Sequence, residues 1–375
     1  MTSSASIPPA ADAPIEGVQG FLVPMSCTDL PATMHFFIAR LGFRLDAIFP
    51  ADGPRTAILS RDGLRLKLGL DVTDGTRTLH VLCDHPEQCP ADAPRELVAP
   101  NGVTVRLVHA NPPMVLPATR QQLVLAHADG NAHWSVGRAG MRYRDLLPER
   151  HGGAFIASHI RILDGGPVPD YVHFHKIRFQ AIFCRKGWVR LVYEDQGEPF
   201  ILEAGDCVLQ PPEIRHRVLE SSAGAEVVEL GSPAEHITMA DHELPLPTPF
   251  FRPERDFNGQ RFVRHVAKHA QWTAWTSPGF LVADTGIGAA TNGLAGVRVV
   301  RAQGQNNEAT RRHDTEFCFF FVLTGSLEVA QGDKRWRLAA DDSIAIPGRF
   351  PYSFARCSAD LELLEVTLPA DFPLA

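Results

Sequence analysis

Two histidines separated by one residue, His173 and His175, are the residues in this sequence best suited to binding a metal ion. Side chains on a β-strand alternate between its two faces, so both imidazoles would point to one side and Phe174 to the other. His216 offers a third imidazole from a later segment. Neutral imidazole nitrogens suit Fe(II), Ni, Cu, Mn or Zn, and ligand type alone does not choose among them. Taken with the repeated pattern and the family resemblance described below, the three histidines indicate a site for one divalent transition metal.

Two further residues close to the histidine pair are candidates for the chemistry. Gln180 is a weak, neutral ligand, so a centre with three histidines would keep its double positive charge and favour an anionic bidentate substrate. The amide either binds the metal through its oxygen or lies beside the ligands and donates a hydrogen bond to substrate or oxygen, and a purely structural role is the third alternative. Arg178 has the same parity as Gln180, so it either holds a substrate carboxylate with two parallel hydrogen bonds or lies on the surface at a hairpin turn.

A repeated pattern positions these residues. In each copy a strand leads to a glycine, a turn follows, and a proline comes six residues after the first residue of that turn. The first copy has Gly187, Gly205-Asp206 and Pro211, and the second has Gly325, Asp341-Asp342 and Pro347. The same order of features, with the same six-residue spacing from turn to proline, indicates two copies of one β-rich unit.

Both copies resemble the cupin family. Its signature is HxH, four residues, Glu, six residues, Gly, followed by Gly-Asp, four residues, Pro, four residues, His; the first copy matches this spacing with Gln180 in place of the glutamate. The resemblance implies a bicupin, that is, two antiparallel jelly-roll barrels in one chain. We expect a metal-binding cupin over 151–240, a crossover over 241–260 and a degenerate cupin over 261–375. The ligand positions of the second copy hold Arg311, His313, Cys318 and Tyr352, from which we expect no second metal site.

The three-histidine set without a carboxylate is similar to the centres of thiol, diketone and gentisate-type dioxygenases, and the gentisate and salicylate ring-cleaving enzymes are also bicupins. This resemblance implies an Fe(II)-dependent dioxygenase that uses O₂ to cleave a C–C bond in a small phenolic, enolic or 2-oxo acid. In that hypothesis His173, His175 and His216 hold the metal, Gln180 orients the bound oxygen or substrate, and Arg178 anchors a carboxylate. Two alternatives stay open: a non-redox isomerase or lyase that uses Zn, Mn or Ni as a Lewis acid, and a metal-dependent small-molecule sensor.

The segment before the repeat has a different pattern. Residues 18–110 contain a strand, a helix predicted to be capped by Thr28 or Asp29 with Pro31 in its first turn, and three strand candidates of which "LRLKLGL" alternates most clearly. This order resembles the glyoxalase-like (vicinal-oxygen-chelate) module, and the strands that can be placed lack its His and Glu ligands. We expect residues 1–17 to be a disordered arm and residues 111–150 a connector. The predicted fold class is mainly β: two cupin jelly-roll barrels preceded by a small α+β glyoxalase-like domain.

Composition limits the partners. The formal net charge of −7 gives no basic surplus, so we expect neither a nucleic-acid nor a membrane partner. The seven cysteines are an odd number, scattered and without a CxxC pair, which indicates reduced thiols. The first residues lack the basic and apolar regions of a signal peptide. We therefore expect a cytoplasmic protein with a small anionic substrate, and a homodimer because strand edges are exposed.

Overall fold

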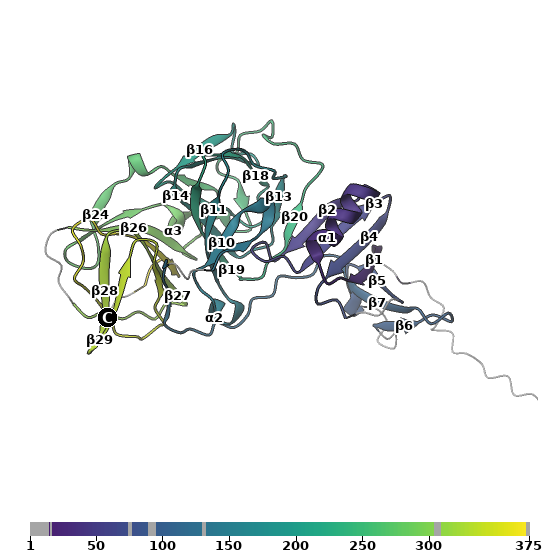
Figure 1. The fold of residues 1–375 in the computed structure, drawn as a ribbon, viewed down its shortest axis with the longest axis horizontal. Coiled ribbons are helices and arrows are strands. Elements are labelled where there is room, and N and C mark those ends of the chain that lie inside the picture. The colour runs from purple at the N-terminus through teal and green to yellow at the C-terminus, as the bar shows by residue number, and fades with distance from the viewer. Residues whose placement is uncertain are drawn as a thin grey trace, which may run out of the picture. The chain divides into compact units, whose positions relative to one another are not determined.

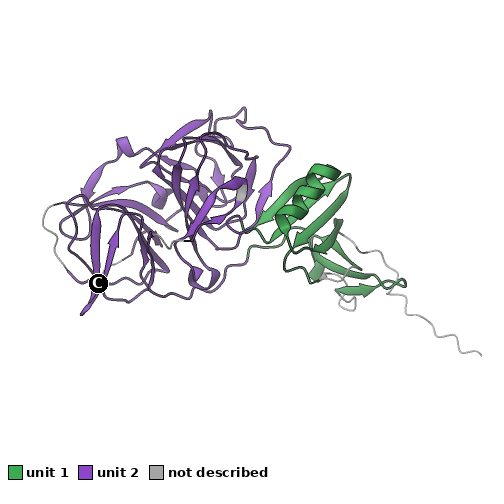
Figure 2. Ribbon diagram, viewed as in Figure 1, with its two compact units in different colours: residues 1–50, 54–114 green, residues 51–53, 115–375 purple. Residues whose placement is uncertain are grey.

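The computed structural model describes residues 15, 17–73, 77–88, 95–129, 133–303 and 309–372. The expected N-terminal arm lies almost wholly outside the described residues. The chain divides into two compact units, residues 1–50 with 54–114 and residues 51–53 with 115–375 (Figure 2). No helix in the described part of the chain is both long and apolar enough to cross a membrane.

The first unit is a strand, a short helix and a β-meander. Its elements are β1 (Val18–Ser26), α1 (Leu30–His35), a π-helical turn η2 (Phe36–Arg40), β2 (Arg44–Phe49), β3 (Thr56–Arg61), β4 (Leu64–Gly69), β5 (Thr78–Cys83), the 3-10 turn η3 (Pro86–Gln88), β6 (Glu96–Val98) and β7 (Thr104–His109). The strand order is β2-β3-β4-β1-β5-β7-β6, with β1 parallel to β4. Asp29 caps α1 by accepting a hydrogen bond from the Ala32 amide at 2.9 Å, and Pro31 lies in the first turn, as the sequence predicts.

The second unit begins with a jelly roll built from two sheets. One sheet runs β16 (Phe200–Glu203), β15 (Trp188–Tyr193), β18 (His216–Ser221), β13 (His173–His175) and β20 (Thr238–Ala240), with β12 (Gly166–Pro167) beside β18. The other runs β23 (Val263–His265), β17 (Cys207–Leu209), β14 (Phe179–Lys186), β19 (Ala225–Ser232), β11 (Ile156–Ile162), β10 (Arg142–Asp145) and β9 (Ser135–Val136). Alternation along β15 and β14 buries apolar side chains such as Val189, Leu191 and Cys184 between the sheets.

A second jelly roll follows in the same unit. Its larger sheet runs β24 (Trp272–Ala274), β25 (Phe280–Asp284), β26 (Gly296–Ala302), β32 (Glu362–Leu368), β27 (Phe317–Thr324), β30 (Ser343–Ala345) and β8 (Val124–Ala126), and its smaller sheet runs β29 (Lys334–Ala339), β28 (Ser326–Gln331) and β31 (Ser353–Ala355) (Figure 1). Remaining elements are β21 (Asp256–Phe257), β22 (Gln260–Arg261), η4 (Arg138–Gly140), η5 (Ala267–His269), α2 (Arg150–Gly153) and α3 (Ile287–Ala290). The predicted mainly β fold with two jelly rolls is confirmed, although each is a two-sheet sandwich and not a closed barrel.

Strands are exchanged between the two jelly rolls. β8, from the expected connector, completes the sheet of the second jelly roll, and β23 adds to the sheet of the first. Between them lies one continuous apolar core in which Phe155 stacks on Phe317 with ring centroids 4.3 Å apart. Because this core is shared, the two jelly rolls pack as one body.

Candidate metal centre

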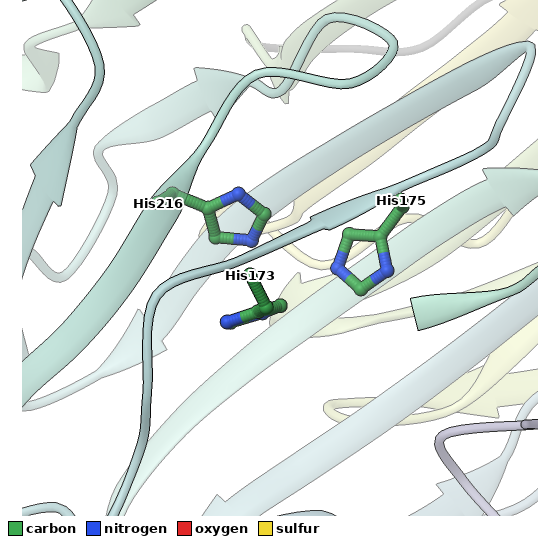
Figure 3. Close-up of side chains that lie close together, drawn as sticks. All are labelled: His173, His175 and His216. Carbon is green, nitrogen blue, oxygen red and sulfur yellow. The ribbon is translucent and has the colours of Figure 1, made fainter. Parts of the chain in front are cut away.

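The three predicted histidines meet in the first jelly roll. β13 and β18 are antiparallel neighbours, and their register places His173 directly opposite His216. His175 lies two residues along β13, on the same face as His173. One ring nitrogen from each histidine lies within 4.8 Å of the other two, and the three side chains are buried (Figure 3). The strand register therefore brings together the three histidines that the two-part cupin signature predicts.

Hydrogen bonds orient all three rings. Each Nδ1 faces an oxygen: the Tyr171 carbonyl at 2.8 Å for His173, the Ile214 carbonyl at 2.9 Å for His216, and the Thr238 hydroxyl at 3.0 Å for His175. A ring that donates from Nδ1 to a carbonyl keeps its lone pair on Nε2, the form that ligates a metal. The buried donor set thus fits a divalent transition metal held through Nε2 atoms.

Gln180 occupies the middle of a buried hydrogen-bond chain. Tyr193 donates to Oε1 of Gln210 at 2.6 Å, Gln210 donates to Oε1 of Gln180 at 3.0 Å, and Gln180 donates to Oε1 of Glu229 at 2.6 Å. Nε2 of Gln210 also lies 3.2 Å from Nε2 of His216. Both ends of the Gln180 amide are therefore engaged by neighbours, which favours a role beside the ligands over direct ligation.

These residues surround a cavity of about 70 Å³. His175, His216, Gln180 and Gln210 contribute its polar wall, and apolar side chains from both sheets contribute the rest, among them Ile160, Ile182, Leu191 and Val227. Among the described residues that line it, Glu229 carries the only formal charge. The cavity suits a small ligand in apolar surroundings with a few polar groups that set its orientation.

Burial keeps the hydroxyl of Tyr193 and two thiols of the same jelly roll protonated. Burial raises the pKa of Tyr193 well above its ordinary value, and Cys207 and Glu229 add smaller contributions. Burial likewise raises the pKa of the Cys184 thiol to about 12 and that of Cys207 far above its usual range. Tyr193 is thus a hydrogen-bond donor at neutral pH, and neither thiol is available as a thiolate nucleophile.

Arg178 does not line the cavity. Its guanidinium pairs with Glu316 of the second jelly roll, with Nη2 3.1 Å from Oε2 and Nη1 3.2 Å from both carboxylate oxygens. The residue precedes the first residue of β14, so the strand parity that links it to Gln180 does not extend to it. The expectation that Arg178 anchors a substrate carboxylate therefore finds no support, because its bidentate partner is a side chain of the same protein.

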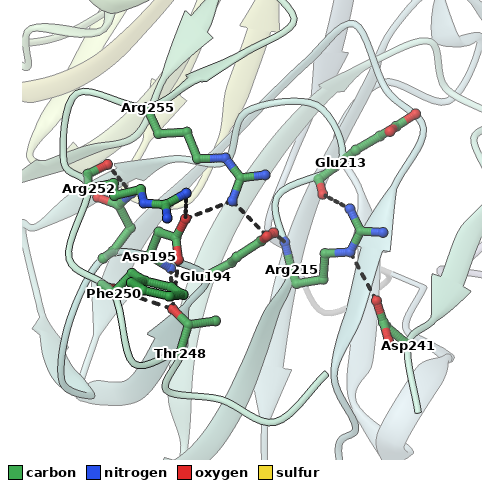
Figure 4. A network of polar contacts seen from close by, with 10 residues as sticks. Glu194, Asp195, Glu213, Arg215, Asp241, Thr248, Phe250, Arg252 and Arg255 are labelled. Atoms are coloured by element: carbon green, nitrogen blue, oxygen red, sulfur yellow. Dashed lines mark hydrogen bonds and ion pairs between the residues drawn. The ribbon is translucent and has the colours of Figure 1, made fainter. Parts of the chain in front are cut away.

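The loop that leads into His216 is held by polar contacts (Figure 4). Arg215 donates to the Glu213 carbonyl at 3.0 Å and to Oδ2 of Asp241 at 3.1 Å, and its guanidinium lies 4.1 Å from the ring centroid of Phe174. These contacts join the residues before His216 to β13 and to the chain after β20. They restrict the direction from which His216 enters the site.

The crossover over 241–260 is fastened to the same jelly roll. Arg255 donates to Glu194 at 2.7 Å and to Asp195 at 2.8 Å, and Thr248 donates to Asp195 at 2.9 Å (Figure 4). The Arg215 amide reaches Oε2 of Glu194 at 3.3 Å. The crossover therefore supports the loop before His216.

The corresponding positions of the second jelly roll hold a different arrangement. The Arg311 guanidinium is buried and lies 4.7 Å from the ring centroid of Trp275 and 4.5 Å from that of Phe354. Tyr352 and Cys318 are also almost fully buried. A fixed cation packed against aromatic faces thus occupies the place where the first jelly roll gathers imidazoles.

A second group of potential ligands lies where the jelly rolls meet. His159 contacts Glu226 at 2.7 Å, and Asp341 approaches them closely enough to share an ion. Two guanidinium groups are paired with these carboxylates, Arg161 with Glu226 at 3.1 Å and Arg185 with Asp341 at 2.9 Å. Cations already neutralise these carboxylates, so the group is an ion-pair network that joins the two jelly rolls.

Sequence reasoning missed Glu229, Gln210 and Tyr193. Glu229 precedes Gly231 by two residues, and Gly231 is opposite Gln180 in the β14–β19 register, so Glu229 and Gln180 are diagonal neighbours on one face. Gln210 directly precedes the motif proline and could have been found by asking which residues flank the signature. The site therefore has a carboxylate, Glu229, beside Gln180 although position 180 itself is neutral.

Comparisons with known proteins agree with this architecture. Residues 297–367, in the second jelly roll, match the family model described as cupin domain. A deletion mutant of Bacillus subtilis oxalate decarboxylase has a TM-score of 0.50 at 12% sequence identity, over 70% of this chain and 80% of that chain. Lactobacillus farciminis oxalate decarboxylase in its formate complex gives 0.48 at 14% identity over 71% and 89% of the two chains, and Ylba from Escherichia coli gives 0.47 at 11% over 68% and 94%. A search of curated proteins finds no significant match.

The fold is therefore that of a bicupin, in which the second jelly roll carries the family match and the first carries the buried histidine triad.

Proposed function

We propose that the protein is a metal-dependent cupin enzyme whose centre is held by His173, His175 and His216. The observation that carries the proposal is the buried triad with each Nδ1 facing an oxygen, next to a small cavity. A bound divalent transition metal would supply Lewis acidity toward chelating oxygens, and Fe(II) would add redox chemistry with O₂. As the specific reaction we propose Fe(II)-dependent C–C cleavage of a small enolic, phenolic or 2-oxo acid.

The residues around the triad have distinct roles in this proposal. The apolar wall excludes water, which strengthens polar interactions inside the cavity. Gln210 and Glu229 hold the Gln180 amide in one orientation, and Gln180 in turn keeps the Glu229 carboxylate at the cavity. The cavity volume favours small 2-oxo or enolic acids over substrates with an aromatic ring. No described Lys or Arg lines this cavity, so the charge of an anionic substrate would be met at the metal.

Metal analysis followed by oxygen uptake tests the proposal. Protein loaded anaerobically with Fe(II) should bind one metal ion per chain and consume O₂ with one or more members of a panel of enolic, phenolic and 2-oxo acids. Protein that retains no transition metal would refute the proposed centre. Metal bound without any O₂ consumption would refute the dioxygenase assignment alone.

A non-redox lyase or isomerase is the second candidate, and Glu229 is the observation that favours it. Such reactions need a group that moves a proton, and a carboxylate at the cavity can do so. Turnover that continues under strict anaerobiosis, with Zn or Mn in place of Fe(II), would select this candidate.

We make two further proposals, one about assembly and one about the first unit. A homodimer is proposed from the exposed strand edges, and size-exclusion chromatography with light scattering tests it. We also propose that the first unit is a glyoxalase-like module without a metal, on the basis of its strand, helix and three-strand order.

A further inference from the structure

One part of the cavity wall comes from a segment that lies far from the first jelly roll in the sequence. Ala51 lines the cavity, and the other described residues that line it lie between Met141 and Glu229. The segment Ala51–Gly53 stands between β2 and β3 in the sequence and belongs to the second compact unit. Strands form most of the remaining wall, so this short segment is the part that sheet hydrogen bonds do not hold.

Three contacts hold the segment in place. Nη2 of Arg150 pairs with Oδ2 of Asp52 at 2.5 Å, and the two side chains are only 23% and 12% exposed. The Ser135 hydroxyl donates to the Asp52 carbonyl at 3.3 Å. Gly137 leaves room for the Ala51 carbonyl, since a Cβ at position 137 would lie 2.9 Å from that oxygen. Residues near β9 and in α2 therefore form a receptor for the segment.

Arg150 is itself held in an unusual conformation. Its φ of 47° lies in the left-handed region, which a residue other than glycine adopts at a cost in free energy. Its guanidinium also lies 3.6 Å from Oδ2 of Asp145, the last residue of β10. One buried cation thus connects the segment to a strand of the first jelly roll.

We propose that Ala51 limits the length of the ligand at the proposed metal centre, and that the Asp52–Arg150 pair positions it there. The inference rests on the proposed function. It narrows the substrate class to short, unbranched 2-oxo or enolic acids.

The length limit follows from the size of the cavity and from its wall. A ligand that chelates a metal at the three histidines directs the rest of its carbon chain away from them. The cavity measures about 70 Å³, and its wall beyond the polar groups is apolar, with Ala51, Met141 and Ile160 among its members. One methylene group more or less in such a pocket changes affinity by about tenfold or more. The size of the side chain at position 51 therefore affects how many carbons the ligand can carry.

Titration with two 2-oxo acids tests the role of Ala51. Zn(II)-loaded wild type, Ala51→Gly and Ala51→Val are titrated by calorimetry with pyruvate and with 2-oxobutanoate, which is one methylene longer. The ratio of 2-oxobutanoate affinity to pyruvate affinity should rise about tenfold in Ala51→Gly and fall about tenfold in Ala51→Val. Ala274→Val, the same change at an exposed end of β24, should keep the wild-type ratio.

A second measurement needs neither metal nor substrate. Diethyl pyrocarbonate modifies accessible imidazoles, and mass spectrometry follows its reaction with the buried His216 in metal-free protein. Asp52→Ala removes the pair with Arg150 and should raise the rate at least about threefold, because the wall opens more often. Asp314→Ala, at an exposed pair with Arg349, should react like wild type. An unchanged rate in Asp52→Ala overturns the positioning role.

The outcomes distinguish this inference from the function on which it rests. Failure of wild type to bind Zn(II) refutes the proposed metal centre and the ligand class with it, whereas the reaction of His216 still decides whether Asp52 holds the wall. Zn(II) binding without binding of either acid refutes the ligand class alone. Equal affinity ratios in wild type and both Ala51 variants overturn the length limit and leave the metal centre intact. If Asp52→Ala does not fold, Arg150→Met removes the same pair and takes its place.

Discussion

Gln180→Glu in the metal-free protein is the substitution for which the structure gives the most direct expectation. It replaces the amide nitrogen that lies 2.6 Å from Oε1 of Glu229 with an oxygen, so two carboxylates face each other at hydrogen-bond distance. If both were ionised, the Coulomb energy at an effective dielectric constant of about 20 would be about 6 kcal/mol. One of the pair will therefore take up a proton and become the donor that the amide was.

The cost of that proton sets the loss of stability. A glutamate has an ordinary pKa of about 4.3, so keeping one protonated at pH 7 costs roughly 3.5 kcal/mol and at pH 5 about 1 kcal/mol. These are upper values because Glu229 is only partly buried. The sign follows from linkage: the folded state binds a proton that the unfolded state lacks at pH 7, so the destabilisation is largest at high pH and is relieved as pH falls.

Urea denaturation of protein stripped of metal with EDTA provides the measurement. The difference in unfolding free energy between wild type and Gln180→Glu should shrink by about 2 kcal/mol or more between pH 7 and pH 5. Gln180→Glu/Glu229→Gln restores one amide and one carboxylate and should lose much less at pH 7. A loss of equal size at both pH values, or no loss at all, would show that the two side chains do not face each other as the structure has them.

Further expectations concern the proposed metal ligands, the Arg178–Glu316 ion pair and the buried His313. Combined His173→Ala and His216→Ala should abolish stoichiometric metal binding measured by elemental analysis, and retention of one metal per chain would refute the site. Arg178→Met removes a partly exposed ion pair with Glu316, so it should lower the free energy of unfolding in urea by about 1 kcal/mol or less and leave KM unchanged. A rise in KM would show that Arg178 contacts the substrate. Burial lowers the pKa of His313, so its contribution to stability is present above its unfolded pKa of about 6.5 and is lost as pH falls below that value. Thermal unfolding from pH 7.5 to 5 should therefore show a falling midpoint in wild type and a shallower fall in His313→Gln, and equal slopes would contradict the assignment.

Local patterns in the sequence were sufficient to predict the broad fold and to single out the three histidines that the structure brings together. The HxH pair needs only the period-two alternation of a strand to put His173 and His175 on one face. The spacing from Gly187 through Pro211 to His216 encodes a return of the chain that brings the third imidazole back beside the first. Turn residues and alternating apolar residues indicated a mainly β chain, because both signals are local.

Contacts between distant segments could not be derived in the same way. Gln180 meets Glu229 across 49 residues and Arg178 meets Glu316 across 138, and each meeting depends on which strands are neighbours and in what register they pair. A shift of one residue in the β14–β19 register would turn Glu229 to the other face, and no local pattern specifies that register. The sequence by itself thus determined which histidines share one face of a strand, and only the tertiary structure decided that Glu229 lies beside Gln180 and that Arg178 pairs with Glu316. The physical reason is that strand periodicity is a property of each segment alone, whereas register and sheet order result from the packing of the whole core.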